Sequence, residues 1–188
     1  MGHSPTNAQP LQIVIHGPES SGKTTLCQAL ATHYQTWIVP EYFRFYWEAK
    51  CFAQPEPPWR SEEFLHIGQM QGQLEEHYKR LAHRVLFCDT DVLGTSVWHR
   101  RYLNTYSEAL EALCRSRRPN LVLLCLPNIP FVQDGVRDGE AVRSSMAEWI
   151  HERLTAHKLP FVTMPPSHEA RMTLAIEHID RLIAGSQS

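Results

Sequence analysis

The stretch Gly17-Pro18-Glu19-Ser20-Ser21-Gly22-Lys23-Thr24-Thr25 decides the fold of this chain. An apolar run at residues 11–15 precedes it, and a helical pattern that begins at Leu26 follows it. The spacing G-x-x-x-x-G-K-[ST] between a strand and a helix is typical of a phosphate-binding loop, because successive backbone N–H groups at a helix N-terminus surround phosphate oxygens. We therefore expect a nucleoside triphosphate to bind here.

Each residue type in this loop has a mechanical role. Gly17 and Gly22 permit backbone angles and a close approach that a side chain would block. Lys23 is expected to reach the β and γ phosphates of ATP, and the hydroxyl of Thr24 to bind Mg²⁺. The loop residues expected to contact the nucleotide besides these are Glu19, Ser20, Ser21 and Thr25. ATP and Mg²⁺ are the predicted cofactors.

The composition predicts a single ordinary domain with a small-molecule partner. The 188 residues carry a formal net charge of -2 and a pI near 6.6, which argues against a nucleic-acid surface. The five cysteines are odd in number and widely spaced, so we expect no disulfide framework and a cytoplasmic location. No apolar run approaches the roughly 18 residues that span a bilayer, so no membrane association is expected.

The order of apolar runs predicts an α/β fold. Residues 1–10 are polar and are expected to form a disordered tail, and residues 11–188 a single domain. Strands alternate with helical patterns, one of which covers residues 97–102, and this order favours a parallel sheet with right-handed crossovers. The prediction is a three-layer αβα sandwich of the P-loop NTPase type, with five mainly parallel strands at residues 11–16, 36–39, 85–88, 121–126 and 161–164.

Acidic residues follow two of the predicted strands. Asp89 and Asp91 end the strand at residues 85–88, and Glu41 follows the strand at residues 36–39. A carboxylate at such a strand end completes a phosphate-loop site, so Asp89 is expected to bind Mg²⁺ together with Thr24. Asp91 has a second interpretation, as the N-cap of the next helix.

A segment dense in charge, proline and glycine, at about residues 128–145, follows the most apolar strand. We interpret it as a lid, because phosphoryl transfer develops charge that a closing arginine neutralises while closure expels water. Arg137 and Arg143 are the candidates. The alternative is that both arginines lie on a solvated surface.

Other motifs separate the classes of phosphate-loop proteins. The sequence D-x-x-G at residues 91–94 is found in GTPases, but Leu126-Pro127-Asn128-Ile129 lacks the N-K-x-D that recognises guanine. A motor needs more chain than 188 residues provide. A small-molecule kinase fits the length and the lid, and the rival is a regulatory switch that binds ATP and hydrolyses it slowly or not at all.

The sequence resembles the ribosylnicotinamide kinase domain of NadR-type bacterial proteins, grouped among small AAA-like ATPases. The motifs that carry the resemblance are GPESSGKTTL at residues 17–26, EYFR at 41–44, FCDTD at 87–91 and VQDGVR at 132–137. The resemblance implies transfer of phosphate from ATP to nicotinamide riboside, giving nicotinamide mononucleotide in NAD salvage, and places Asp134 near the substrate. The chain departs from the family pattern at Phe45, Gly94 and Phe131, which leaves another nucleoside or small metabolite as an alternative acceptor.

The expected chemistry is attack of an acceptor hydroxyl on the γ-phosphate, with Lys23, Mg²⁺ and Arg137 balancing charge. Glu41 or Asp91 would orient the hydroxyl or take its proton, and Glu41 is favoured. Arg143 is expected to contact the nucleotide. Candidates for holding the ribose and the aromatic base are Tyr42, Arg44, Trp47 and Trp98.

Overall fold

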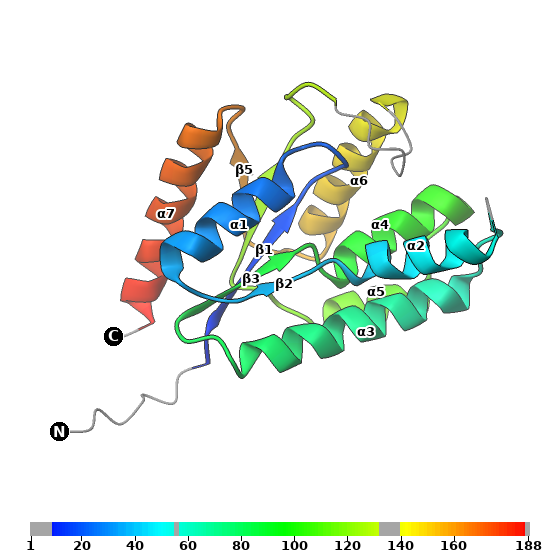
Figure 1. Ribbon diagram of the computed structural model, residues 1–188, viewed down its shortest axis with the longest axis horizontal. Helices are drawn as coiled ribbons and strands as arrows, with labels where there is room; N and C mark the ends of the chain where they lie inside the picture. The colour runs from blue at the N-terminus through cyan, green and yellow to red at the C-terminus, as the bar shows by residue number, and fades with distance from the viewer. Residues whose placement is uncertain (1–8, 55–56, 132–139, 187–188) are drawn as a thin grey trace.

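The computed structural model describes residues 9–54, 57–131 and 140–186, and within them a single parallel sheet (Figure 1). The strand order is β2-β3-β1-β4-β5, and every neighbouring pair is parallel. The strands are β1 (Leu11–His16), β2 (Ile38–Val39), β3 (Val85–Asp89), β4 (Leu121–Cys125) and β5 (Phe161–Met164). The prediction of a five-stranded parallel sheet is confirmed.

Helices cover both faces of this sheet and make the three layers of the sandwich (Figure 1). One face is covered by α1 (Lys23–Tyr34) and α7 (His168–Gly185). The other face is covered by α3 (Ser61–Lys79), α4 (Val92–Leu103), α5 (Glu108–Arg115) and α6 (Arg143–Ala156). The helix α2 (Tyr42–Ala53) follows β2 and packs against α3.

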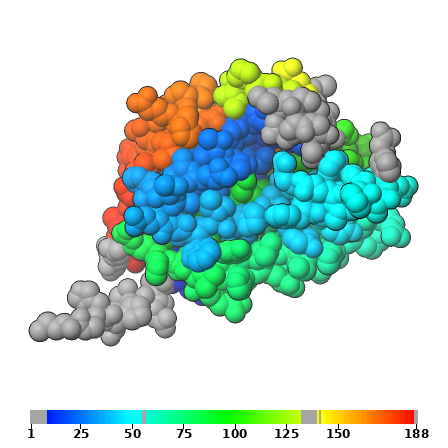
Figure 2. Space-filling view, in the orientation of Figure 1, coloured from blue at the N-terminus to red at the C-terminus, as the bar shows by residue number. Residues whose placement is uncertain are grey.

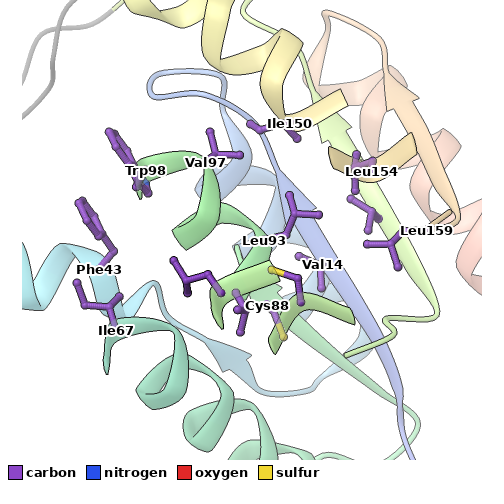
Figure 3. Packing of buried hydrophobic residues seen from close by; sticks show 14 of the residues in the cluster. Val14, Phe43, Ile67, Cys88, Leu93, Val97, Trp98, Ile150, Leu154 and Leu159 are labelled. Atoms are coloured by element: carbon purple, nitrogen blue, oxygen red, sulfur yellow. The ribbon is translucent and has the colours of Figure 1, made fainter. Parts of the chain in front are cut away.

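The central strands β1, β3 and β4 are largely apolar, and both of their faces are buried. In β1, Ile13 and Ile15 pack with α1 and α7, while Val14 between them packs with the helices of the other face. Successive side chains of a strand point to opposite faces, so one unbroken apolar run supplies two cores. Figure 3 shows the second core, in which Val14 and Cys88 of the sheet lie near Leu93 of α4.

The helix with the pattern at residues 97–102 begins at Val92, as the N-cap interpretation of Asp91 requires. Asp91 is its N-cap, because the Asp91 carboxylate accepts a hydrogen bond from the Leu93 N–H at 2.8 Å. The first turns of α4 are buried and contain Gly94, so the amphipathic spacing that marks a surface helix is absent there.

Most of the predicted tail and the middle of the predicted lid lie outside the described residues. Residues 1–8 and 132–139 are not described, and the latter include Asp134 and Arg137. The described end of the lid segment is a 3₁₀ turn, η1 (Glu140–Val142), that leads into α6. All five cysteines are free, as expected. Over the described ranges, no helix has the length and apolarity needed to cross a bilayer.

Candidate active site

The phosphate loop joins the central strand β1 to α1 at the carboxyl edge of the sheet. Two of its residues have left-handed backbones, Ser20 with φ 54° and Gly22 with φ 80°. Gly17 is required for space, since a Cβ there would lie 2.4 Å from the Cys125 carbonyl oxygen. The loop encloses the phosphate cavity, which has a volume of about 100 Å³ and is lined by residues 19–25, Glu41, Arg44 and Trp98.

Thr24 and Asp89 meet at the floor of this site. The Thr24 hydroxyl donates to Asp89 Oδ2 at 2.7 Å, and the other carboxylate oxygen, Oδ1, is buried without a hydrogen-bond partner. A hydroxyl beside a carboxylate with a vacant oxygen fits Mg²⁺, which takes oxygen ligands and draws the others from water and phosphate. In the described ranges no larger cluster of His, Cys, Asp or Glu suits a metal.

Glu41 stands at the N-cap of α2, opposite Lys23. Burial raises the pKa of its carboxyl group, while the positive charge of Lys23 acts in the opposite direction. The indole N–H of Trp98 donates to Glu41 Oε1 at 3.3 Å. Glu41 is thus a partly desolvated carboxylate held beside the phosphate cavity, and such a group is suited to accept a proton.

Aromatic side chains from α2 and α4 form a second cavity next to the first. Phe43 and Trp98 stack with ring centroids 4.9 Å apart and an interplanar angle of 3° (Figure 3). We name this the aromatic cavity; it is lined by Glu19, Glu41, Phe43, Arg44, Trp47, Trp98 and Tyr102. The two cavities share Glu19, Glu41, Arg44 and Trp98.

Tyr42, one of the predicted substrate residues, does not line either cavity. Its backbone N–H donates to Gln71 Oε1 at 2.8 Å, and its ring packs on His66 of α3. Consecutive residues of a helix point about 100° apart, so α2 can direct only one of this pair inward. That residue is Phe43, which sequence reasoning did not select.

Asp91 does not face either cavity, which corrects its predicted role with the acceptor. Its carboxylate is buried, and Oδ1 pairs with His16 Nε2 at 2.8 Å while also capping α4. Burial alone would raise the pKa of Asp91, but the neighbouring His16 and the backbone hydrogen bonds hold this pKa below its usual value. The second interpretation of Asp91, as a helix cap, is confirmed.

Thr90 separates the two aspartates and has a left-handed backbone with φ 73°. This conformation is unusual for a β-branched residue. Its N–H donates to the Ile15 carbonyl at 3.1 Å, and a Cβ on Gly94 would lie 2.1 Å from its hydroxyl oxygen. The hydrogen bond to β1 therefore fixes the turn at Thr90, and the turn is possible because residue 94 is a glycine. It allows Asp89 to contact Thr24 while Asp91 contacts His16.

Arg143, expected to be a lid arginine on the nucleotide, contacts the main chain, and its guanidinium also lies 5.4 Å from the centroid of the Phe131 ring and 3.9 Å from the Glu140 carboxylate. It is the first residue of α6 and only 3% exposed, and it donates to the carbonyls of Ser20 and Ile129, both at 3.0 Å. The helix holds the guanidinium behind the loop. Arg171 of α7, which sequence reasoning missed, makes a similar contact with Ser21.

Comparison with known proteins assigns this architecture to a family. A family model described as an AAA domain matches residues 12–171. The chain belongs to this AAA-domain family. The trifunctional NAD biosynthesis/regulator protein NadR of Salmonella typhimurium is 28% identical to this AAA domain in an alignment of 185 residues that covers 95% of the chain and 45% of the relative. NadR of Escherichia coli matches with the same identity and coverage. The chain spans about half the length of these curated relatives.

Solved structures share the fold of this AAA domain. A NadR protein in complex with NR has a TM-score of 0.76 and 23% identity, covering 92% of this chain and 51% of that one. Thymidylate kinase of Ehrlichia chaffeensis has a TM-score of 0.64 and 12% identity, covering 92% of this chain and 99% of that one. The P-loop sandwich and the NadR-type resemblance are thus confirmed.

Proposed function

We propose that this protein is a kinase that transfers the γ-phosphoryl group of ATP to a hydroxyl of nicotinamide riboside. The observation that carries the proposal is the wall shared by the phosphate cavity and the aromatic cavity at Glu41, Arg44 and Trp98. An acceptor whose flat ring lies among the aromatic side chains would present its ribose toward the phosphates. Positioning of this kind supplies much of the catalysis in phosphoryl transfer.

The residues of the chain divide the work between phosphate and acceptor. The loop N–H groups and Lys23 hold the phosphates and balance their charge. Thr24 and Asp89 would hold Mg²⁺, which when bound neutralises charge on the phosphate oxygens. Glu41 orients the acceptor hydroxyl and takes its proton, while the oxygen forms a bond to the γ-phosphorus and ADP leaves.

Nicotinamide riboside is the favoured acceptor for two reasons. The NadR relatives are named for NAD biosynthesis, and one structure of the same fold is a complex with NR. The aromatic cavity is also lined by Glu19 and Glu41, besides the cation Arg44, and aromatic faces with nearby carboxylates suit a cationic pyridinium ring. The other functions in the relatives' names are not part of the proposal.

A panel of acceptors assayed for ADP formation tests the proposal. We expect ATP consumption to depend on nicotinamide riboside and to be much slower with ordinary nucleosides. Equal ATP consumption with and without any acceptor contradicts the kinase proposal and favours the regulatory switch. Preference for another nucleoside supports the kinase activity but contradicts nicotinamide riboside as the acceptor. Lys23→Ala is the negative control, since it removes the cation that reaches the β and γ phosphates.

A further inference from the structure

Arg171 joins three segments at the carboxyl edge of the sheet. Its Nη1 donates to the Ser21 carbonyl at 2.6 Å, its Nη2 to Asn128 Oδ1 at 3.1 Å and its Nε to the Pro165 carbonyl at 2.6 Å. These acceptors follow β1, β4 and β5, which are neighbours in the sheet. In Figure 2 the blue atoms of α1, the orange atoms that begin α7 and the yellow-green atoms after β4 come together.

The contact with Ser21 determines which way the phosphate loop faces. A peptide unit is planar and trans, so its carbonyl oxygen and its N–H point in opposite directions. Arg143 holds the Ser20 carbonyl and Arg171 holds the Ser21 carbonyl, both from behind the loop. The N–H groups of Ser21 and Gly22 belong to the same two peptide units, and they are therefore turned away from the arginines.

The charge of Arg171 has no partner of opposite sign among the described residues. Its side chain is 3% exposed, and the three acceptors named above are neutral. A buried cation without a counter-charge is costly unless an anion comes close to it. Its field reaches the loop region: burial raises the pKa of the Cys125 thiol to about 11, and the charges of Arg171 and Lys23 oppose that rise.

We propose that Arg171 is a positioning residue for phosphate binding, which aligns the Gly22 N–H group through the Ser21 carbonyl and supplies positive charge beside the loop. This inference rests on the proposed function, because it assumes that the loop binds the phosphates of ATP. Arg171 acts through the loop and on the phosphate part of the ligand. The acceptor in the aromatic cavity should not depend on it.

The test compares Arg171→Gln and Arg171→Lys with Arg181→Gln, a matched change on the same helix at an exposed site. Binding of ATP and of tripolyphosphate is measured by calorimetry, and folding is checked by circular dichroism. We expect Arg171→Gln to weaken binding of both ligands about tenfold to hundredfold, as for loss of a charge-assisted contact. The affinity of Arg171→Lys for both ligands should lie between the affinities of Arg171→Gln and the native protein. Arg181→Gln should leave binding unchanged.

Two further readouts separate positioning from a general loss of structure. The KM for ATP should rise in Arg171→Lys while the KM for nicotinamide riboside stays within about twofold, as expected for a local effect on the phosphates. Native-like binding of tripolyphosphate by folded Arg171→Lys and Arg171→Gln overturns the inference, as does weakening confined to ligands that contain adenosine. If Arg171→Gln does not fold, Arg171→Lys alone decides. Failure of the native protein to bind ATP would instead remove the proposed function.

Discussion

The phosphate cavity and the aromatic cavity share a wall but are assembled differently. The first is lined mainly by one continuous stretch, residues 19–25, and the shared wall completes it; Asp89 of the neighbouring strand contacts this stretch at Thr24. The second is made by side chains of α2 and α4, with Phe43 and Trp98 stacked across the gap between them. A backbone site depends on local geometry, whereas a side-chain site depends on how two helices pack. Substitutions on the two sides should therefore change different kinetic constants.

Asp89→Asn, on the phosphate side, should give the largest loss of activity. It removes the charge that would hold Mg²⁺ beside Thr24, so we expect kcat to fall by about 10²- to 10³-fold. Steady-state assays with saturating acceptor measure this fall. Asp180→Asn is the control, because it makes the same chemical change where Asp180 accepts a hydrogen bond from Tyr34 of α1. A loss below tenfold for Asp89→Asn would contradict its assignment.

Glu41→Gln tests the shared wall and should lower kcat about 10²-fold through loss of the proton acceptor. The raised pKa of Glu41 also determines whether this carboxyl group stabilises or destabilises the folded protein as the pH changes. The native state binds this proton more tightly than the unfolded chain, so the carboxyl contributes stability at acid pH that is lost as pH rises through the raised pKa.

Glu41→Gln is therefore expected to be more stable than the native protein at neutral pH. The difference should vanish below about pH 4, where Glu41 is protonated in both the folded and the unfolded state. Thermal melting across this range checks the sign, and exposed Glu48→Gln on the same helix is the control. The native kcat should fall as pH decreases through the raised pKa, while the kcat of Glu41→Gln stays flat. A variant less stable at neutral pH would refute the burial argument.

Trp98→Leu changes a residue of the shared wall whose stacked ring belongs to the aromatic cavity. Loss of the stacked indole should raise the KM for nicotinamide riboside about tenfold, since an aromatic contact with a desolvated cation contributes about 1–2 kcal/mol. The KM for ATP should change less than about threefold. Trp37→Leu removes a 48% exposed indole outside the cavity and serves as the control. Equal rises in both KM values would show that the cavities are not separable.

Gly94→Ala tests the turn at Thr90 that positions Asp89 and Asp91. Of the four substitutions, it is expected to have the smallest effect. The new Cβ would lie 2.1 Å from the Thr90 hydroxyl oxygen, so we expect a loss of about 1–3 kcal/mol in the free energy of unfolding. Gly185→Ala, where nothing lies within 4 Å, should change it by less than about 0.5 kcal/mol. Urea denaturation measures both, and equal stability of the two variants would argue against a tight turn.

The same contrast explains what could be predicted from the sequence. The placement of the loop and the contact of Asp89 with Thr24 were predictable because they follow from local spacing and from the geometry of parallel strands. Arg171 was not, because it contacts Ser21 from 150 positions away and an arginine in a helical pattern carries no signal of its own. The pairing of His16 with Asp91 spans 75 positions and was missed for the same reason.

The aromatic side was the harder half to predict. The sequence Tyr42-Phe43-Arg44-Phe45-Tyr46-Trp47 is aromatic around most of the helix, so periodicity does not say which ring turns inward. Packing against α4 decides it, in favour of Phe43. The start of α4 was left open likewise, with Asp91 as one candidate N-cap, because Val92, Leu93 and Gly94 are all buried and leave no polar face to mark the helix.

The direction of the strands has a practical consequence for measuring these ligands. Both cavities lie at the carboxyl edge, whereas β1 begins and α7 ends on the opposite side of the molecule (Figure 1). A biotin or affinity tag at either end of the chain would therefore anchor the protein to a sensor chip with its cavities facing the flowing solution. Association and dissociation rates of ATP and nicotinamide riboside could then be recorded on one oriented surface, without labelling either ligand.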